Sequence, residues 1–215
     1  MPVGLLRRFA TFASSPDAAV SLVGAYIKWR TVDFPLDANR AGIFLPVEPS
    51  TFPKNWLQRG GECKEGNPVI FATGCAYKVS IPLEHYVKRC CHLIDETFPD
   101  DSEPGRVSLF IDVRPMDGMP NEPGINFLPF FRALTSLLSK YYPERIHLIL
   151  LYPMPWIATI ALNTIKSALG PDLGNKILVL SGGQGKPAPK KLLEYIDAGQ
   201  LPNDDLVKEY HMDFN

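Results

Sequence analysis

The sequence predicts an α/β domain in which helices flank a largely parallel sheet, preceded by a short helical N-terminal segment. Two apolar runs, 107–113 and 146–152, have the composition of strands covered on both faces, the usual setting of parallel strands. The connections between these runs are long enough for a helix, as a parallel crossover requires. A chain of 215 residues with 46% hydrophobic and 21% charged residues is typical of a globular protein that buries a sizeable core.

The N-terminal part predicts a helix, because Asp17 can cap a segment that continues to about Trp29 with apolar side chains at helical spacing. Residues 33–54 contain the Pro and Asn residues that are typical of a loop. We therefore expect three parts in the chain. They are a short helical lobe over 1–35, a linker over 36–54 and the main domain over 55–215.

Strands and helices alternate through the main domain. In the helix predicted over 128–141, Pro129 falls in the first turn, where its missing N–H group is tolerated. Repeated strand–helix steps favour right-handed crossovers and a parallel sheet. The expected elements, in chain order, are strand 68–73, helix 83–98, strand 107–113, helix 128–141, strand 146–152, a helix after Pro155, strand 176–180 and helix 190–197.

Charge and cysteine content exclude several classes of protein. The 22 basic and 23 acidic residues give a net charge of −1, so no global positive field attracts nucleic acid. The four cysteines lack the paired spacing of a zinc site, and the first residues lack the apolar core of a secretion signal. We expect reduced thiols and a cytoplasmic protein.

The stretch between Arg145 and Lys166 has no charged residue and reaches the length of a membrane-spanning helix. Pro153 and Pro155 lie in its middle, and its first half has the composition of a strand. A transmembrane span is therefore not expected.

Known catalytic motifs are incomplete in this sequence. The string LSGGQ at 180–184 resembles a transporter ATPase signature, but no phosphate-binding GxxxxGK[ST] loop accompanies it. We expect no catalytic residue, no metal and no cofactor. A hydrolase or phosphatase remains the less favoured alternative, resting on Asp112, Asp117 and Cys75. A salt bridge or turn cap within the 112–118 loop, which also contains Arg114, explains Asp112 more simply.

The helix predicted after Pro155 is apolar almost all round, so it needs cover on two sides. It is either a central core helix or a lid whose second side faces an apolar ligand or a membrane. Pro153 and Pro155 would suit a hinge for such a lid.

The order of several short motifs resembles the CRAL-TRIO lipid-binding family. YYPER at 141–145 precedes an apolar strand, a Pro-containing turn, a helix that includes Ile165 and Lys166, and then KILVL at 176–180. Upstream, Gly66–Val69 is similar to the family's "GRPV" strand entry, and Trp29–Arg30 to the end of its N-terminal helical lobe. The resemblance covers most of residues 17–202.

This resemblance implies a non-enzymatic protein that binds one hydrophobic molecule, such as a phospholipid, in an apolar pocket under a mobile gate helix. The implied role is lipid transfer or sensing, with transient contact with a membrane surface. The implied gate residues are Trp156, Ile157, Ile160, Ala161, Thr164 and Ile165. Candidate wall residues are Phe71, Phe110, Phe127, Phe130 and Phe131.

The chain departs from the pattern of family members that bind phosphatidylinositol. Residues 11–16 contain no Arg, and Leu201–Pro202 is followed by Asn203, Asp204 and Asp205 rather than by glycines and a basic residue. Recognition of an inositol phosphate is therefore not expected. A second hypothesis keeps the fold with a filled pocket and makes the protein an interaction module for a protein partner.

Overall fold

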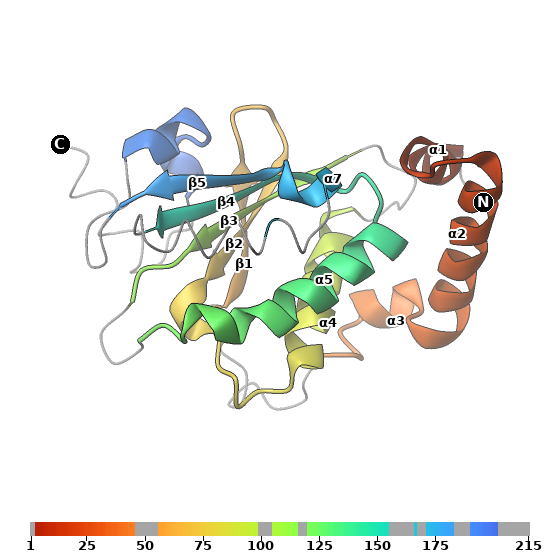
Figure 1. Cartoon of the computed structure of the whole chain (residues 1–215), viewed down its shortest axis with the longest axis horizontal. Helices are drawn as coiled ribbons and strands as arrows, with labels where there is room; N and C mark the ends of the chain where they lie inside the picture. The colour runs from red at the N-terminus through yellow and green to blue at the C-terminus, as the bar shows by residue number, and fades with distance from the viewer. Residues whose placement is uncertain are drawn as a thin grey trace.

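A five-stranded sheet in the order β1-β2-β3-β4-β5 forms the centre of the computed structural model (Figure 1). The structure describes residues 3–45, 56–98, 105–115, 120–154, 166, 171–182 and 190–201. The strands are β1 (Leu57–Glu62), β2 (Pro68–Thr73), β3 (Val107–Asp112), β4 (Ile146–Met154) and β5 (Ile177–Ser181).

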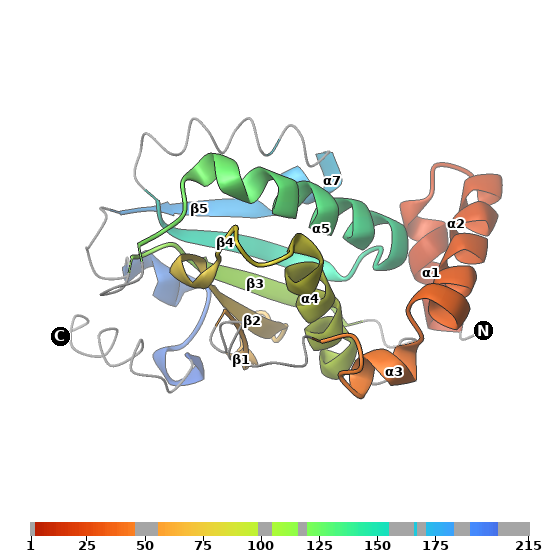
Figure 2. The ribbon, with the colours of Figure 1, turned by 90° about the horizontal axis from the view of Figure 1, so that it is seen from below.

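The predicted parallel sheet is confirmed, because β2, β3, β4 and β5 pair in parallel. Strand β1, which the sequence did not predict, adds an antiparallel edge to β2. Helix α4 (Leu83–Thr97) links β2 to β3, and α5 (Leu128–Tyr141) links β3 to β4. Since each crossover advances the sheet in the same direction with the same hand, both helices cover the same face (Figures 1 and 2).

The larger hydrophobic core lies between that face and the helices. Alternate strand residues such as Ile70, Ile111 and Ile149 point into it, where they join Phe130 and Leu134 of α5. Their neighbours in sequence point to the opposite face, because side chains alternate along a strand. Both faces are therefore apolar, as the composition of the two central strands predicts.

The second face carries a smaller core, covered by the chain segment 190–201. Here η4 (Lys190–Glu194) is a 3₁₀ helix where the sequence predicts a longer helix. The segment continues to the sheet edge at β1, where the Lys64 backbone N–H donates to the Tyr195 carbonyl at 2.8 Å. Its contacts thus lie on the β1 side of the sheet, although the strand that precedes it in the described chain, β5, forms the opposite edge. The residues of this core are Cys63, Val69, Phe71, Phe110, Leu150, Tyr152, Leu180, Leu192, Ile196 and Leu201.

The N-terminal helices lie beside one end of α5 (Figures 1 and 2). They are α1 (Val3–Phe12), α2 (Pro16–Lys28), the π-helical turn η1 (Trp29–Asp33) and α3 (Leu36–Arg40). The prediction that Asp17 caps α2 is wrong. Ser15 is the cap, since its side chain accepts a hydrogen bond from the Ala18 N–H at 3.2 Å, and Asp17 lies in the first turn.

Helix α3 falls within the segment that the sequence assigns to a linker. Its Asn39 is fully buried, and the His92 ring nitrogen Nδ1 donates to the Asn39 carbonyl at 2.6 Å. Because residues 46–55 are outside the described ranges, the boundary between linker and main domain stays a prediction.

Candidate ligand-binding site

The YYPER motif forms the corner between α5 and β4. The Tyr142 hydroxyl donates to Asp95 Oδ1 at 3.0 Å, and the Arg145 guanidinium donates to the Gly105 carbonyl at 2.7 Å. Arg145 is 1% exposed, with its guanidinium 4.2 Å from the Phe98 ring centroid. The motif is therefore structural: it fixes the start of β4 against α4 and β3.

Asp95 of α4 collects several of these contacts. Its carboxylate accepts two hydrogen bonds from Arg30 at 2.8 Å each and one from Asn39 Nδ2 at 2.6 Å, besides the one from Tyr142. Burial raises the pKa of the Tyr142 hydroxyl well above its usual value, which keeps it a donor. Asp95 thus joins the N-terminal helices to the helix that borders the candidate site.

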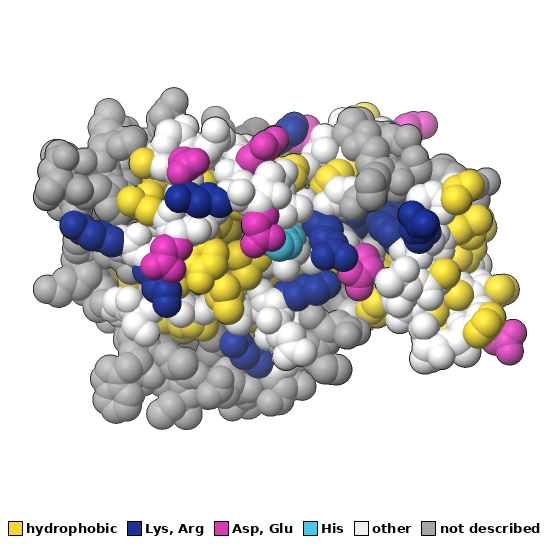
Figure 3. Space-filling view, turned by 90° about the horizontal axis from the view of Figure 1, so that it is seen from above, with side chains coloured by type: hydrophobic (Ala, Val, Ile, Leu, Met, Phe, Trp, Pro, Cys, Tyr) yellow, Lys and Arg dark blue, Asp and Glu magenta, His cyan; other side chains and the backbone are white. Residues whose placement is uncertain are grey.

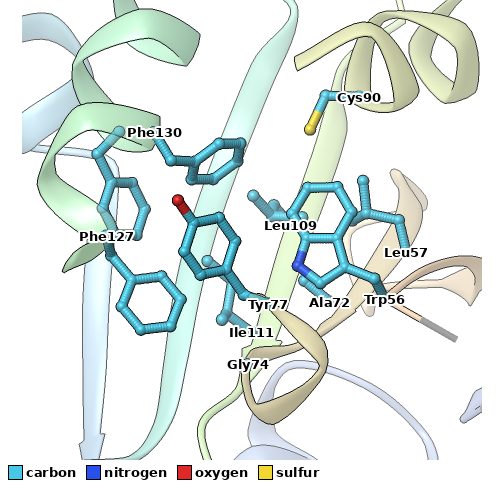
Figure 4. Close-up of a pocket in the computed structure, with 11 residues that line it drawn as sticks. Trp56, Leu57, Ala72, Gly74, Tyr77, Cys90, Leu109, Ile111, Phe127 and Phe130 are labelled. Carbon is cyan, nitrogen blue, oxygen red and sulfur yellow. The ribbon is translucent and has the colours of Figure 1, made fainter. Parts of the chain in front are cut away.

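A small apolar cavity lies between the sheet and helices α4 and α5, about 30 Å³ in volume. Residues from β1, β2, β3, α4, α5 and the turns η2 (Gly74–Ala76) and η3 (Gly124–Phe127) surround it (Figure 4). None of the lining side chains is acidic or basic. They are Trp56, Leu57, Ala72, Gly74, Tyr77, Cys90, Leu109, Ile111, Phe127, Phe130 and Phe131.

Aromatic contacts set the shape of the cavity. Tyr77 stacks on Phe127 with ring centroids 4.6 Å apart, and Trp56 meets Phe130 edge to face at 5.5 Å. Behind them Tyr86 is fully buried and packs edge to face on Trp56 at 4.5 Å. The Tyr86 hydroxyl accepts from the Lys78 N–H at 2.8 Å, and burial raises its pKa to about 12. These rings are held from several sides, so the walls are preorganised.

Two small residues adjust the walls. At Gly74 a Cβ atom would lie 3.0 Å from the Asp112 carbonyl oxygen, so only glycine lets η2 approach the end of β3 this closely. Cys90 directs its sulfur toward the gap between Trp56 and Phe130 (Figure 4). Burial raises the pKa of this thiol well above its usual value, so it stays neutral. The cavity therefore offers uncharged contacts only.

The structure brings together three of the five predicted wall residues. Phe127, Phe130 and Phe131 line the cavity. Phe71 and Phe110 lie in the core of the opposite face, edge to face at 5.6 Å. A ligand role for these two stays a prediction without support from the cavity. The predicted gate residues lie outside the described part of the chain: Trp156, Ile157, Ile160, Ala161, Thr164 and Ile165.

The sequence analysis missed the residues that complete the cavity, above all Trp56 and Tyr77. Both stand beside strands rather than within them, at the start of β1 and after η2. Hydrophobic periodicity identifies buried residues within helices and strands, so it does not identify residues in the connections between them. An aromatic residue next to a Gly-containing turn was the available signal.

The residues on which a hydrolase would depend have structural surroundings. Arg114 is 8% exposed and holds the Asp112 carboxylate through Nε at 3.0 Å and NH2 at 2.7 Å, as the simpler interpretation predicts. Cys75 is completely buried. Asp117 is outside the described residues. Over the described ranges, no helix is long and apolar enough to cross a membrane, and no group of three His, Cys, Asp or Glu side chains could hold a metal ion.

Comparison with known proteins places this architecture. The chain superposes on a crystal structure of Sfh5 with a TM-score of 0.70, over 96% of this chain and 74% of that chain, at 14% sequence identity. That likeness shows the fold. No curated protein sequence matches the chain. The model of the CRAL/TRIO domain matches residues 61–204, well over half of the sequence. By that match the chain belongs to the CRAL/TRIO domain family.

Proposed function

We propose that the protein binds one hydrophobic molecule, a phospholipid or a compound of similar apolarity, and transfers or presents it without chemical change. The observation that carries this proposal is the aromatic cavity with no charged lining residue, in a chain of the CRAL/TRIO domain family. Uncharged walls favour a hydrocarbon group, because a charged group would lose its hydration and find no partner. Each methylene group buried there contributes about 0.8 kcal/mol.

The size of the cavity limits what it can hold. At about 30 Å³ it is far smaller than the roughly 300–1,000 Å³ of a pocket for a drug-sized ligand. The cavity would receive only the narrow end of a ligand. We propose that the helix expected after Pro155, within residues 153–169, covers the rest as a gate. Its residues toward the ligand would be Trp156, Ile157, Ile160, Ala161, Thr164 and Ile165.

The proposed carrier works in the cytoplasm and meets a membrane surface only while loading and unloading. The buried Arg30–Asp95 pair supports an N-terminal lobe, residues 1–35, that moves together with the main domain. Helix α3, which lies within the 36–54 segment, packs on α4 of the main domain. This contact supports a fixed connection between the N-terminal lobe and the main domain.

A second candidate function is an interaction module with a filled pocket. The small volume of the cavity favours it, as do six large hydrophobic residues exposed within residues 3–45. Such a module would bind a protein partner through its surface and would carry no lipid.

Native mass spectrometry of the purified chain separates these functions. A carrier should show an added mass that organic extraction releases as a lipid, in about one copy per chain. Ala72→Leu, which adds bulk to the cavity wall, should reduce the bound fraction, whereas Ala10→Leu on the exposed side of α1 should not. If the measured mass stays that of the chain alone after incubation with phosphatidylcholine vesicles, the carrier function is contradicted.

The gate helix needs its own test, lipid transfer between donor and acceptor vesicles. Ile160→Asp would place a charge on the apolar side of the helix, and transfer should fall about tenfold. Val20→Asp, at an exposed position of α2, is the control. Unchanged transfer by a folded Ile160→Asp variant removes this residue from the mechanism.

A further inference from the structure

Two loops beside the cavity carry exposed apolar residues at their tips. Val79, in the connection from η2 to α4, is 55% exposed, and Ile125, in η3, is 68% exposed. Each stands two residues from a cavity wall residue, Tyr77 and Phe127 respectively, and those two rings stack at 4.6 Å. Figure 2 shows η2 and the start of α5 side by side, in agreement with that contact. We call residues 78–82 and 120–126 the rim.

Hydrogen bonds through Glu122 join the two loops. The Val79 N–H donates to Glu122 Oε1 at 3.3 Å, and Asn126 Nδ2 donates to Glu122 Oε2 at 3.1 Å. Lys78 Nζ donates to the Pro120 carbonyl at 3.4 Å. The rim is therefore a joined unit, and its exposed apolar tips are held on the same structure.

The exposed residues of the rim carry no charge. They are Val79, Ser80, Pro82, Pro120, Pro123 and Ile125. The two charged residues of the rim, Lys78 and Glu122, are partly buried, opposite in sign and engaged in the hydrogen bonds just described. A surface with this composition favours an apolar medium over water and is indifferent to the sign of a partner's charge.

The N-terminal helices expose more hydrophobic residues but in a different setting. Val20 and Val32 are 72% and 67% exposed, yet they alternate with exposed charges of both signs, such as Asp17 and Lys28. Figure 3 shows hydrophobic and charged side chains mixed at this end of the molecule. Mixed charges of this kind suit contact with water or with a protein partner better than insertion into a bilayer.

We infer that the rim is the surface that docks on a lipid bilayer, inserting Val79 and Ile125 at the membrane interface beside the cavity. The inference rests on the proposed carrier function and adds the place of contact. Because the two charges of the rim are opposite in sign and hydrogen-bonded within it, docking depends on apolar insertion and does not require anionic lipid. A hydrocarbon group leaving the bilayer there would meet Tyr77 and Phe127, the wall residues nearest the rim.

The test is co-flotation of the full chain with phosphatidylcholine vesicles. The variant Val79→Ser with Ile125→Ser should bind about tenfold more weakly, since two apolar side chains no longer enter the interface. The control is Val20→Ser with Val32→Ser, which removes two side chains of similar exposure and should bind like the parent. Both pairs alter exposed positions, and thermal unfolding checks that each variant is folded.

Several outcomes would overturn the inference. They are weaker binding by the control pair but not by the rim pair, no flotation of the parent chain, or flotation that needs phosphatidylserine and disappears in high salt. Binding of a short-chain phosphatidylcholine in free solution is measured on the same samples. If the parent chain binds none, the proposed function fails. If the parent and the rim variant both bind it but float equally, only the docking site fails.

Discussion

Arg30 and Asp95 form a two-point ion pair, with NH1–Oδ2 and NH2–Oδ1 both at 2.8 Å, across a sequence distance of 65 residues. Their side chains are 8% and 3% exposed, so water hydrates and screens the two charges only weakly. The guanidinium also lies 4.4 Å from the Trp29 ring centroid. This pair is one of several contacts that connect the N-terminal helices to the main domain.

Removal of one partner from this pair should be costly. Arg30→Met leaves the Asp95 carboxylate buried without its cation, and we expect the free energy of unfolding to fall by about 3–5 kcal/mol. Arg106→Met is the matched control, because the Arg106–Glu144 pair is exposed at 47% and 25% and should contribute at most about 1 kcal/mol. Urea unfolding of both variants measures the difference. Equal losses would show that the Arg30 pair is no more than a surface contact.

Phe130 and Phe110 separate a role in stability from a role in binding. Both are buried, at 6% and 0% exposure, so truncation of either to Ala should lower the free energy of unfolding by about 3–5 kcal/mol. Only Phe130 lines the cavity. Phe130→Ala should therefore change the amount or the chain length of bound lipid in native mass spectra, and Phe110→Ala should not. A change on Phe110→Ala alone would move the ligand to the other face of the sheet.

Two glycines should respond to alanine with opposite signs. Gly24 lies inside α2 with open space around its Cβ position, so Gly24→Ala should stabilise the protein by about 0.5–1 kcal/mol. At Gly74 the added methyl group would lie 3.0 Å from the Asp112 carbonyl, and Gly74→Ala should destabilise it by about 1–3 kcal/mol. Thermal unfolding measures both. A neutral Gly74→Ala would mean that η2 can move away from β3 at little cost.

Stability should fall in alkali partly through Cys91. Burial, with the nearby Asp95 charge, raises the pKa of this thiol from 9.0 to about 12. Above pH 9 the unfolded chain releases the thiol proton while the folded chain keeps it, so deprotonation favours the unfolded state. The free energy of unfolding is therefore unaffected by this thiol below pH 9 and falls as the pH rises from 9 toward 12. Urea unfolding at several pH values should show this decline, and Cys91→Ala should make it shallower. An identical slope in the variant would assign the decline to other groups.

The sequence predicted the strands that have apolar surroundings on both faces. The runs around Val107 and Ile146 are apolar on both faces, so they could only be interior strands. Strand β1 reads LQRGGE, and its polar residues and paired glycines carry no strand signal, because an edge strand needs less burial. The neighbour β2 supplies its pairing partners, which local composition does not reveal.

The candidate site could be predicted only in part, for a reason of geometry. Alternation along a strand shows that Ile70 and Phe71 point to opposite faces, but both faces of this sheet are apolar, so polarity does not show which one borders the cavity. Phe130 follows from helical periodicity on α5. Trp56 and Tyr77 depend on how turns approach one another in space, which spacing in the sequence does not determine.

The position of segment 190–201 over the second face has a consequence for folding on the ribosome. Strand β1 is synthesised long before the residues that cover its side of the sheet: Gln200, which accepts from the Glu62 N–H, follows 138 residues later, and Ile196 pairs with Cys63. Until then Phe71 and Phe110 remain uncovered and the β1 edge is open to pairing with another chain. A chaperone that shields exposed strand edges and apolar sheet surface is therefore expected to increase the yield of folded protein most during this interval.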